Sequence, residues 1–247
     1  CAAFPEFTNN DEQYLETVLH DPEITILGAN YGKEKLVALR TLAGTFVGDV
    51  AQRILELRPK IVGCTAMVQQ HCAALALLRK VKELAPSVHT MLGGPVCEGT
   101  MGQVAKRAFP WVDVVVSGEA DELFAPLCLR LLTPDSERSA APWPAGVLAG
   151  SGQTPDRHDA PTSTAVVRNL DNLPTPDFSD YLAQLRQSPI RSSFVAHLVA
   201  ETARGCWWGE KHGCSFCGSG SHHPRVAYRA KSPERALAEI ETLTATY

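Results

Sequence analysis

The chain has 247 residues, of which 45% are hydrophobic, and its formal net charge is −4. This length suits one large domain, or one domain and part of another. So small a net charge gives no field that would gather nucleic acid or anionic lipid, and neither is an expected partner. No apolar run approaches the roughly 20 residues that cross a bilayer, and no signal-peptide pattern opens the chain. We therefore expect a cytoplasmic protein without a membrane partner.

The two ends of the sequence lead us to expect a fragment. The chain begins at Cys1 rather than Met, and it stops at Tyr247 inside an expected helix. Near the first end, "EITILGANYGKE" predicts a short strand and a glycine turn. The glycines of this stretch lack the spacing of a phosphate loop, and no Ser or Thr follows Lys33. A nucleotide phosphate site is not expected there.

From Phe46 onward, helical and strand patterns alternate at short spacing. They predict helices within 47–58, 70–86, 100–109 and 120–132, and strands within 60–65, 88–95 and 112–119. Short apolar strands that alternate with amphipathic helices are typical of a parallel sheet covered on both faces. We expect an α/β, doubly wound domain over residues 1–132.

The second half of the chain predicts a linker and the beginning of another unit. Residues 133–165 are rich in Pro, Ser, Gly and Ala, with a possible small hairpin at "GVLAGSGQ", while 170–182 is a proline-stiffened connector. A strand is expected at 194–202, and Ser232 with Pro233 begins a final helix. We expect a linker over 133–189 and a second α/β unit over 190–247.

The stretch "ETARGCWWGEKHGCSFCGSGSHH" carries the clearest chemical signal. It holds Cys206, Cys214 and Cys217, whereas the other cysteines are scattered. Thiolates at this density bind soft metals well. Zinc could take these cysteines with a nearby histidine, and a [4Fe–4S] cluster could take all three and leave one iron open to a small molecule. Spacing alone leaves zinc, an iron–sulfur cluster and unligated cysteines open.

Taken together, several motifs resemble a known family. "ETARGCWWGEKHGCSFCG", "YRAKSPERALAEIETL", "LDNLPTPDFSDYL", "GGPVCEGTMG" and "VDVVVSGEADELF" are similar to segments of cobalamin-dependent radical S-adenosylmethionine (SAM) enzymes, in particular those that mature ribosomally made peptides such as bacteriocins. The resemblance covers residues 46–247. It favours a [4Fe–4S] cluster over zinc in the cysteine loop.

For the second unit, the resemblance implies the start of a partial (β/α) barrel. Cys206, Cys214 and Cys217 would ligate the cluster, with Phe216 among the cofactor contacts, and Glu201 and Arg204 flank the loop. The open iron would bind SAM, and an electron from a flavodoxin or ferredoxin would release a radical that attacks a precursor peptide. Methyl transfer to an unactivated carbon, and a radical rearrangement or cyclisation, both remain open. A zinc-stabilised binding module is a further alternative, and the fragment by itself is expected to be inactive.

For the first domain, the resemblance implies a Rossmann-like fold that binds cobalamin at the carboxyl edge of its sheet. Ligands sit beyond strand ends in such folds, where glycines let a cofactor approach the backbone. The candidate contacts are Gly63, Cys64, Thr65, Gly93, Gly94, Pro95, Gly118 and Glu119. The alternative for the glycines is ordinary turn chemistry. No D-x-H-x-x-G motif is present, so no histidine of that motif is expected on cobalt.

Overall fold

The computed structural model describes residues 12, 13, 16, 33–134, 137, 141–150, 164–193, 195–212 and 227–247. The chain divides into two compact units, Cys1–Ala165 and Val166–Tyr247. The boundary falls within the predicted linker. Within the described ranges, no helix is both long and apolar enough to cross a membrane.

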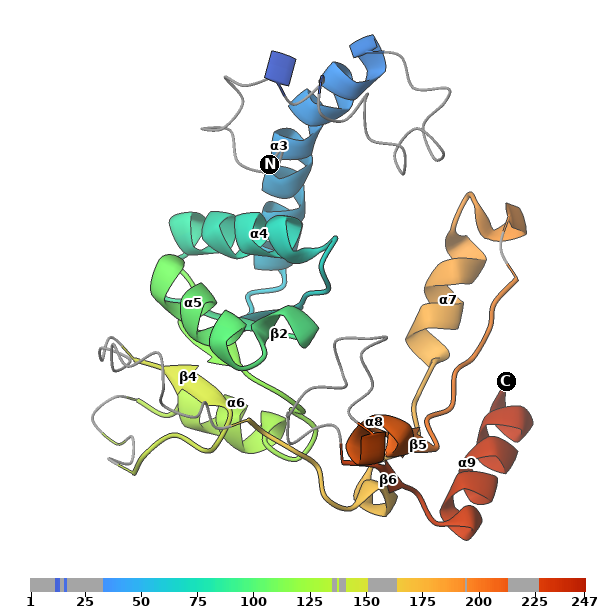
Figure 1. The fold of residues 1–247 in the computed structure, drawn as a ribbon. Coiled ribbons are helices and arrows are strands. Elements are labelled where there is room, and N and C mark those ends of the chain that lie inside the picture. The colour runs from blue at the N-terminus through green and yellow to red at the C-terminus, as the bar shows by residue number, and fades with distance from the viewer. Residues whose placement is uncertain are drawn as a thin grey trace. The chain divides into compact units, whose positions relative to one another are not determined.

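The first unit is built on a sheet whose strands follow one another in chain order (Figure 1). The strands are β1 (Ile61–Thr65), β2 (His89–Gly93), β3 (Val114–Val116) and β4 (Val147–Ala149). The first three run parallel, and Thr65 at the end of β1 pairs with Gly93 at the end of β2. This confirms the predicted α/β class with a parallel sheet.

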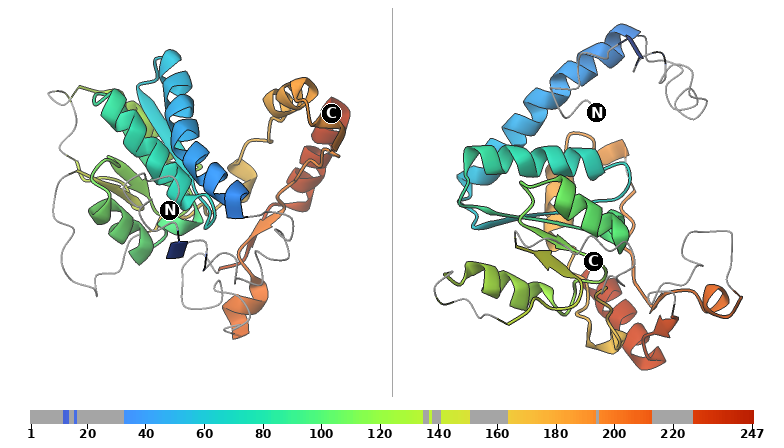
Figure 2. Two further views of the ribbon diagram at one scale, coloured as in Figure 1. Left: turned by 90° about the horizontal axis from the view of Figure 1, so that it is seen from above. Right: turned by 60° about the vertical axis from the view of Figure 1, so that its left-hand side comes forward.

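Helices cover both faces of this sheet (Figures 1 and 2). The elements are α3 (Lys33–Glu56), α4 (His71–Leu84), the 3-10 turn η2 (Pro95–Cys97), α5 (Thr100–Ala108) and α6 (Phe124–Leu132). The crossovers β1–α4–β2 and β2–α5–β3 step in the same direction across the sheet. Right-handed crossovers of that kind place α4 and α5 on one face. Helix α3 packs against α4, and α6 covers the opposite face.

Alternate residues of the strands fill two separate cores. Leu92 and Val115 pack with Leu78 of α4 on one face. Met91 packs with Leu127 of α6 on the other face. Because both faces are buried, the strands read as continuous apolar runs, which is why the sequence pattern located them correctly.

One arm of the predicted hairpin at "GVLAGSGQ" is a strand in the structure. Residues 147–149 form β4, which pairs antiparallel with β3 and extends the sheet. Val147 is buried and contributes to the core under α6. The apolar triplet gains burial and backbone hydrogen bonds by joining the edge of the sheet, which an isolated hairpin would not provide. The other half of the predicted hairpin begins at residue 151, outside the described ranges.

The second unit is mostly helical where it is described. It contains the 3-10 turns η3 (Leu170–Asn172) and η4 (Arg191–Ser193), the helices α7 (Ser179–Gln187), α8 (Trp207–His212) and α9 (Pro233–Thr246), and the short strands β5 (Ala203–Arg204) and β6 (Arg229–Ala230). As predicted, Ser232 caps α9: its hydroxyl accepts a hydrogen bond from the Arg235 amide at 3.2 Å.

The strand predicted at 194–202 is wrong. Residues 195–202 have no strand structure, and β5 is a two-residue strand that pairs antiparallel with β6. Val195 and Val199 are 79% and 71% exposed, so this apolar stretch lacks the burial that would hold a strand in a sheet. The start of a (β/α) barrel is therefore not evident in the described residues.

The proline-stiffened connector is anchored to the start of α9. The Asp171 carboxylate accepts a hydrogen bond from the Ser232 amide at 2.7 Å. Arg235 donates to the Leu173 carbonyl at 2.7 Å and lies 3.2 Å from the carboxylate of Glu239. Glu239 also pairs with Lys231 at 2.6 Å, and both side chains are at most 2% exposed. This buried ion pair fixes the chain just after β6 onto α9.

Candidate functional site

The carboxyl edge of the parallel sheet brings the predicted cofactor contacts together. The register pairs Cys64 with Leu92 and Thr65 with Gly93. A Cβ built on Gly93 would lie 3.8 Å from the Cβ of Val116, so the end of β3 is adjacent too. Residues 64–65, 93–95 and 118–119 therefore share one edge, as parallel strands require, and Gly63 lies in the middle of β1 beside Met91.

Two of the glycines at this edge are required by the fold itself. Gly94 has φ of 97°, and a Cβ there would lie 2.6 Å from the Ala66 carbonyl oxygen. Gly118 has φ of 100°, and its Cβ would lie 2.3 Å from the Ala165 carbonyl oxygen. A side chain at either position would force neighbouring backbone apart. Turn chemistry thus accounts for both glycines without a cofactor.

The other two glycines leave space. A Cβ on Gly63 would meet only the Met91 Cβ at 3.8 Å, and Gly93 likewise has its nearest contacts at ordinary van der Waals distance. Thr65 and Pro95 are exposed at the same edge. These four residues leave room for a ligand beside the backbone.

Cys64 faces a different environment. Its side chain is partly buried and packs against the core between the sheet and α4. Burial raises the pKa of the Cys64 thiol, because the charged thiolate is disfavoured away from water. The thiol is therefore harder to ionise than that of an exposed cysteine.

Ser117 is a residue of this edge that the sequence did not single out. It is fully buried, and its hydroxyl accepts a hydrogen bond from the Gly99 amide at 2.9 Å. Its own amide donates to the Gly146 carbonyl at 2.7 Å. Ser117 thus ties the end of β3 to the loop that leads into α5. Its only signal in the sequence is its place directly before Gly118.

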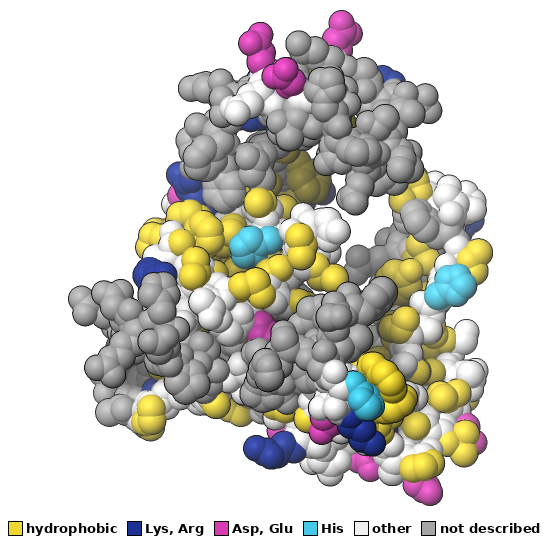
Figure 3. Space-filling model, viewed as in Figure 1, with side chains coloured by type: hydrophobic (Ala, Val, Ile, Leu, Met, Phe, Trp, Pro, Cys, Tyr) yellow, Lys and Arg dark blue, Asp and Glu magenta, His cyan; other side chains and the backbone are white. Residues whose placement is uncertain are grey.

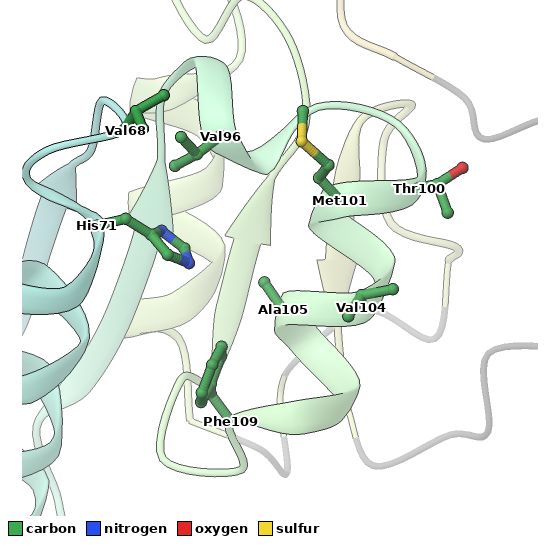
Figure 4. Close-up of a pocket in the computed structure, with 8 residues that line it drawn as sticks. All are labelled: Val68, His71, Val96, Thr100, Met101, Val104, Ala105 and Phe109. Carbon is green, nitrogen blue, oxygen red and sulfur yellow. The ribbon is translucent and has the colours of Figure 1, made fainter. Parts of the chain in front are cut away.

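An open pocket of about 560 Å³ lies beside this edge, between the start of α4 and helix α5 (Figure 4). It is lined by Val68, His71, Val96, Thr100, Met101, Val104, Ala105 and Phe109. Figure 3 shows hydrophobic side chains gathered over α4 and α5, and Val68 and Met101 are 78% and 56% exposed. Val68 follows β1 and Val96 follows β2, so one end of the pocket lies near the carboxyl ends of both strands, and Phe109 lines it just beyond the end of α5.

His71 is the notable polar group of this pocket. Its ring packs edge-on against Phe109, with ring centroids 6.3 Å apart. Its Nδ1 is buried and has no hydrogen-bond partner among the described residues. A buried ring nitrogen without a partner is unfavourable, and a ligand with a complementary polar atom would relieve that cost. No sequence motif marks His71, because a lone histidine at a helix start matches none.

The cysteine loop is described only at its two ends. Cys206 lies just before α8, and its Sγ accepts a hydrogen bond from the Gly209 amide at 3.3 Å. Cys214, Cys217 and Phe216 lie outside the described residues. Within the described part of the chain, no three potential metal ligands come together. The three-cysteine site therefore stays a prediction.

The residues that flank Cys206 are placed clearly. Arg204 pairs with Glu201 through two hydrogen bonds of 2.8 and 2.9 Å, a local ion pair that orders the approach to Cys206. Trp207 and Trp208 are each about half exposed, and their rings pack edge to face at 5.6 Å. Trp208 also stacks on His212, with centroids 4.0 Å apart. The two indoles thus form a partly exposed aromatic surface beside Cys206.

Comparison with known proteins matches the first unit to a family. Residues 13–127 match the B12 binding domain. This match covers the β1–β3 sheet, its carboxyl edge and the pocket beside α5. The cobalamin (vitamin B12) expected from the sequence is thus supported by the domain that carries the candidate contacts.

Individual relatives extend the match over more of the chain. An anaerobic magnesium-protoporphyrin IX monomethyl ester cyclase of Rubrivivax gelatinosus is 30% identical over 79% of this chain and 33% of its own length. The cobalamin-dependent radical SAM methyltransferase TokK of Streptomyces tokunonensis is 27% identical over 79% of this chain and 27% of its own length. A 2-(S-pantetheinyl)-carbapenam-3-carboxylate methyltransferase of Streptantibioticus cattleyicolor is 28% identical over 74% and 25%.

The identities and coverages show that the resemblance to these relatives is distant and partial. The chain is distantly related to cobalamin-dependent radical SAM enzymes, and it spans 33% or less of the length of the three relatives named. A B12 binding domain fits the carboxyl edge found here. The apolar pocket with the unpartnered Nδ1 of His71 lies between α4 and α5, whereas a Cβ on Gly63 or Gly93 would point to the face that α6 covers. Each is a separate place where part of a large cofactor with apolar and polar groups could be bound.

Proposed function

We propose that this chain is the cobalamin-binding and cluster-binding part of a cobalamin-dependent radical SAM enzyme. Its substrate is a ribosomally synthesised peptide, and its reaction is methyl transfer to an unactivated carbon. The observation that carries the proposal is the B12 binding domain match over residues 13–127, coupled to a three-cysteine loop in the same chain. The relation to a cobalamin-dependent radical SAM methyltransferase supports the same pairing of cofactors.

Each unit has its own task in this proposal. At the carboxyl edge, the backbone beside Gly63 and Gly93 and the pocket around His71 hold cobalamin and exclude water from one side of it. In the second unit, the thiolates of Cys206, Cys214 and Cys217 ligate the cluster. When bound, a [4Fe–4S] cluster with SAM supplies a carbon-centred radical and cobalamin supplies the methyl group. An electron donor such as flavodoxin or ferredoxin completes the reaction.

A second candidate reaction is radical cyclisation without methyl transfer. The relation to a cyclase, which is 30% identical over the aligned residues, favours it. The two reactions differ in the mass of the product, because methylation adds one CH₂ and cyclisation adds no carbon. Mass spectrometry of the peptide after turnover by the full-length enzyme separates them.

The test of the proposal is elemental analysis of iron, cobalt and zinc in protein reconstituted without oxygen. The sample contains iron, sulfide and hydroxocobalamin, and a Cys206→Ala, Cys214→Ala, Cys217→Ala triple variant runs beside it. We expect about four irons and about one cobalt per chain, with the iron lost and the cobalt kept in the variant. Zinc at about one per chain, without iron or cobalt, would instead establish a zinc-stabilised module.

A further inference from the structure

Glu210 joins the two ends of the cysteine loop. Its backbone amide donates to the Cys206 carbonyl at 2.9 Å, as part of the first turn of α8. Its carboxylate accepts a hydrogen bond from the Tyr228 amide at 2.9 Å. Cys214 and Cys217 lie between Glu210 and Tyr228 in the sequence. One residue thus connects the chain that enters the loop with the chain that leaves it.

The entering end is ordered around the first cysteine. The Cys206 Sγ accepts the Gly209 amide proton at 3.3 Å, so the sulfur is held against the turn that carries Glu210. Gly209 is buried at this point. An N–H that points at a cysteine sulfur stabilises its thiolate, and such hydrogen bonds also tune the reduction potential of an iron–sulfur cluster.

The leaving end is anchored independently. Tyr228 precedes β6, whose Arg229 pairs with Arg204 of β5 in the antiparallel ribbon. Directly after β6, the Lys231 amide donates to the Thr202 carbonyl at 2.9 Å, and the Lys231 ammonium is buried against Glu239. The Glu210 carboxylate therefore accepts a hydrogen bond from a segment that the β5–β6 pairing and the Lys231 contacts also hold in place.

We propose that Glu210 is a positioning residue for the iron–sulfur cluster, because its carboxylate fixes Cys206 relative to the strand that returns from the loop. This inference rests on the proposed function. A carboxylate suits the task, since a hydrogen bond between an ionised acceptor and a backbone amide is shorter and stronger than a neutral one. Fixing Cys206 relative to the returning strand would hold this ligand of the cluster in one position.

Three variants of Glu210 test this role. Glu210→Ala removes the acceptor, Glu210→Gln keeps an acceptor of the same reach, and Glu210→Asp keeps the charge but is one methylene shorter. Glu241→Ala is the matched control, because Glu241 is an exposed glutamate of α9. The full chain is reconstituted without oxygen, and the readouts are iron loss to a chelator and the cluster's midpoint potential and electron paramagnetic resonance spectrum.

We expect the Ala and Asp variants to lose iron about tenfold faster and to show a shifted potential, because a hydrogen bond to a charged group is lost. The Gln variant should lose iron at a rate between those of the Ala variant and the wild type, because its neutral oxygen accepts a weaker hydrogen bond. The Glu241→Ala control should match the wild type, and cobalt content should be unchanged in all. Should the Ala variant fail to fold, the Asp variant carries the test. Wild-type kinetics and potential in the Asp variant would overturn the role of Glu210. Absence of iron from the wild type would instead overturn the proposed function.

Discussion

Asp177 is an exposed carboxylate that three groups hold in its charged form. Its Oδ1 accepts hydrogen bonds from the Ser179 amide at 2.8 Å and from the Tyr247 hydroxyl at 2.7 Å. Hydrogen bonds from the Ser179 side chain, then from Tyr247 and from the Ser179 amide, lower the pKa of Asp177 from 3.8 to about 2. The contacts connect the start of α7 with the end of α9. Because the pKa is depressed, their stabilisation is present above pH 3.8 and is lost as the pH falls through about 2.

The Tyr247→Phe variant tests this network. The phenylalanine keeps the ring contact with Phe178 and removes only the hydroxyl. We expect the pKa of Asp177 to rise toward its ordinary value, because a hydrogen bond to the carboxylate form is lost. A carboxyl-carbon nuclear magnetic resonance titration measures it directly. An unchanged titration midpoint would show that Ser179 alone sets the pKa.

We expect the Cys97 thiol not to be alkylated in the folded protein. It is fully buried, and burial raises the pKa of its thiol to about 11. At pH 8 only about one thiol in a thousand is then ionised, and the thiolate is the reactive form. We expect iodoacetamide to label the exposed Cys72 in the folded, iron-free protein and to reach Cys97 only after unfolding. Peptide mass spectrometry reads both sites, and equal labelling rates would contradict the burial of Cys97.

At the scale of elements, α5 packs so closely on η2 that one position excludes a side chain. A Cβ built on Gly102 would lie 2.0 Å from the Cys97 carbonyl oxygen. We expect Gly102→Ala to lower the free energy of unfolding by about 1–3 kcal/mol, because the helix must move away from backbone. In α3, a Cβ on Gly48 meets nothing within 4 Å, so Gly48→Ala should raise the same free energy by about 0.5–1 kcal/mol. Urea unfolding measures both variants, and effects of the same sign would be inconsistent with this packing.

The sequence predicted the elements well wherever both the pattern and the burial agree. Leu92 and Met91 are buried in the cores on opposite faces of the sheet, so the apolar run that contains them is a central strand. The apolar run at 194–202 looks the same in sequence, but Val195 is exposed and residues 195–202, the described part of the run, form no strand. A local sequence pattern identifies apolar residues that are stabilised by burial. It does not show whether another element packs against them.

The candidate site likewise has features that the sequence predicts and features that depend on tertiary packing. The edge with Thr65 and Gly93 was predictable, because parallel strands end at one edge. The pocket was not, because His71 and Phe109 are brought together only by the packing of α4 and α5. Cys206 could be placed, whereas Cys214 and Cys217 lie outside the described residues and stay predictions.

For the whole molecule, cobalamin should protect one unit and leave the other unchanged. A ligand that binds only the folded state slows the exchange of amide hydrogens that exchange through unfolding. When the free ligand concentration is about 100 times the dissociation constant, the exchange rate falls by up to about a hundredfold. With hydroxocobalamin present, we expect slower exchange in peptides that contain 63–71 and 93–105. Peptides of α9 should exchange at the same rate with and without the ligand. Protection confined to α9 would place the ligand outside the first unit.

The close approach of Gly94 to Ala66 has a consequence for reading the evolution of this domain. A side chain at 94 would collide with backbone whether or not a cofactor is bound, so selection for folding alone keeps this glycine. Gly93 has room for a Cβ, and a domain that had lost its cofactor would be free to accumulate alanine or serine there. Gly94 is therefore constrained by the turn. Substitution at Gly93 in related sequences would instead indicate that the domain no longer binds a ligand there.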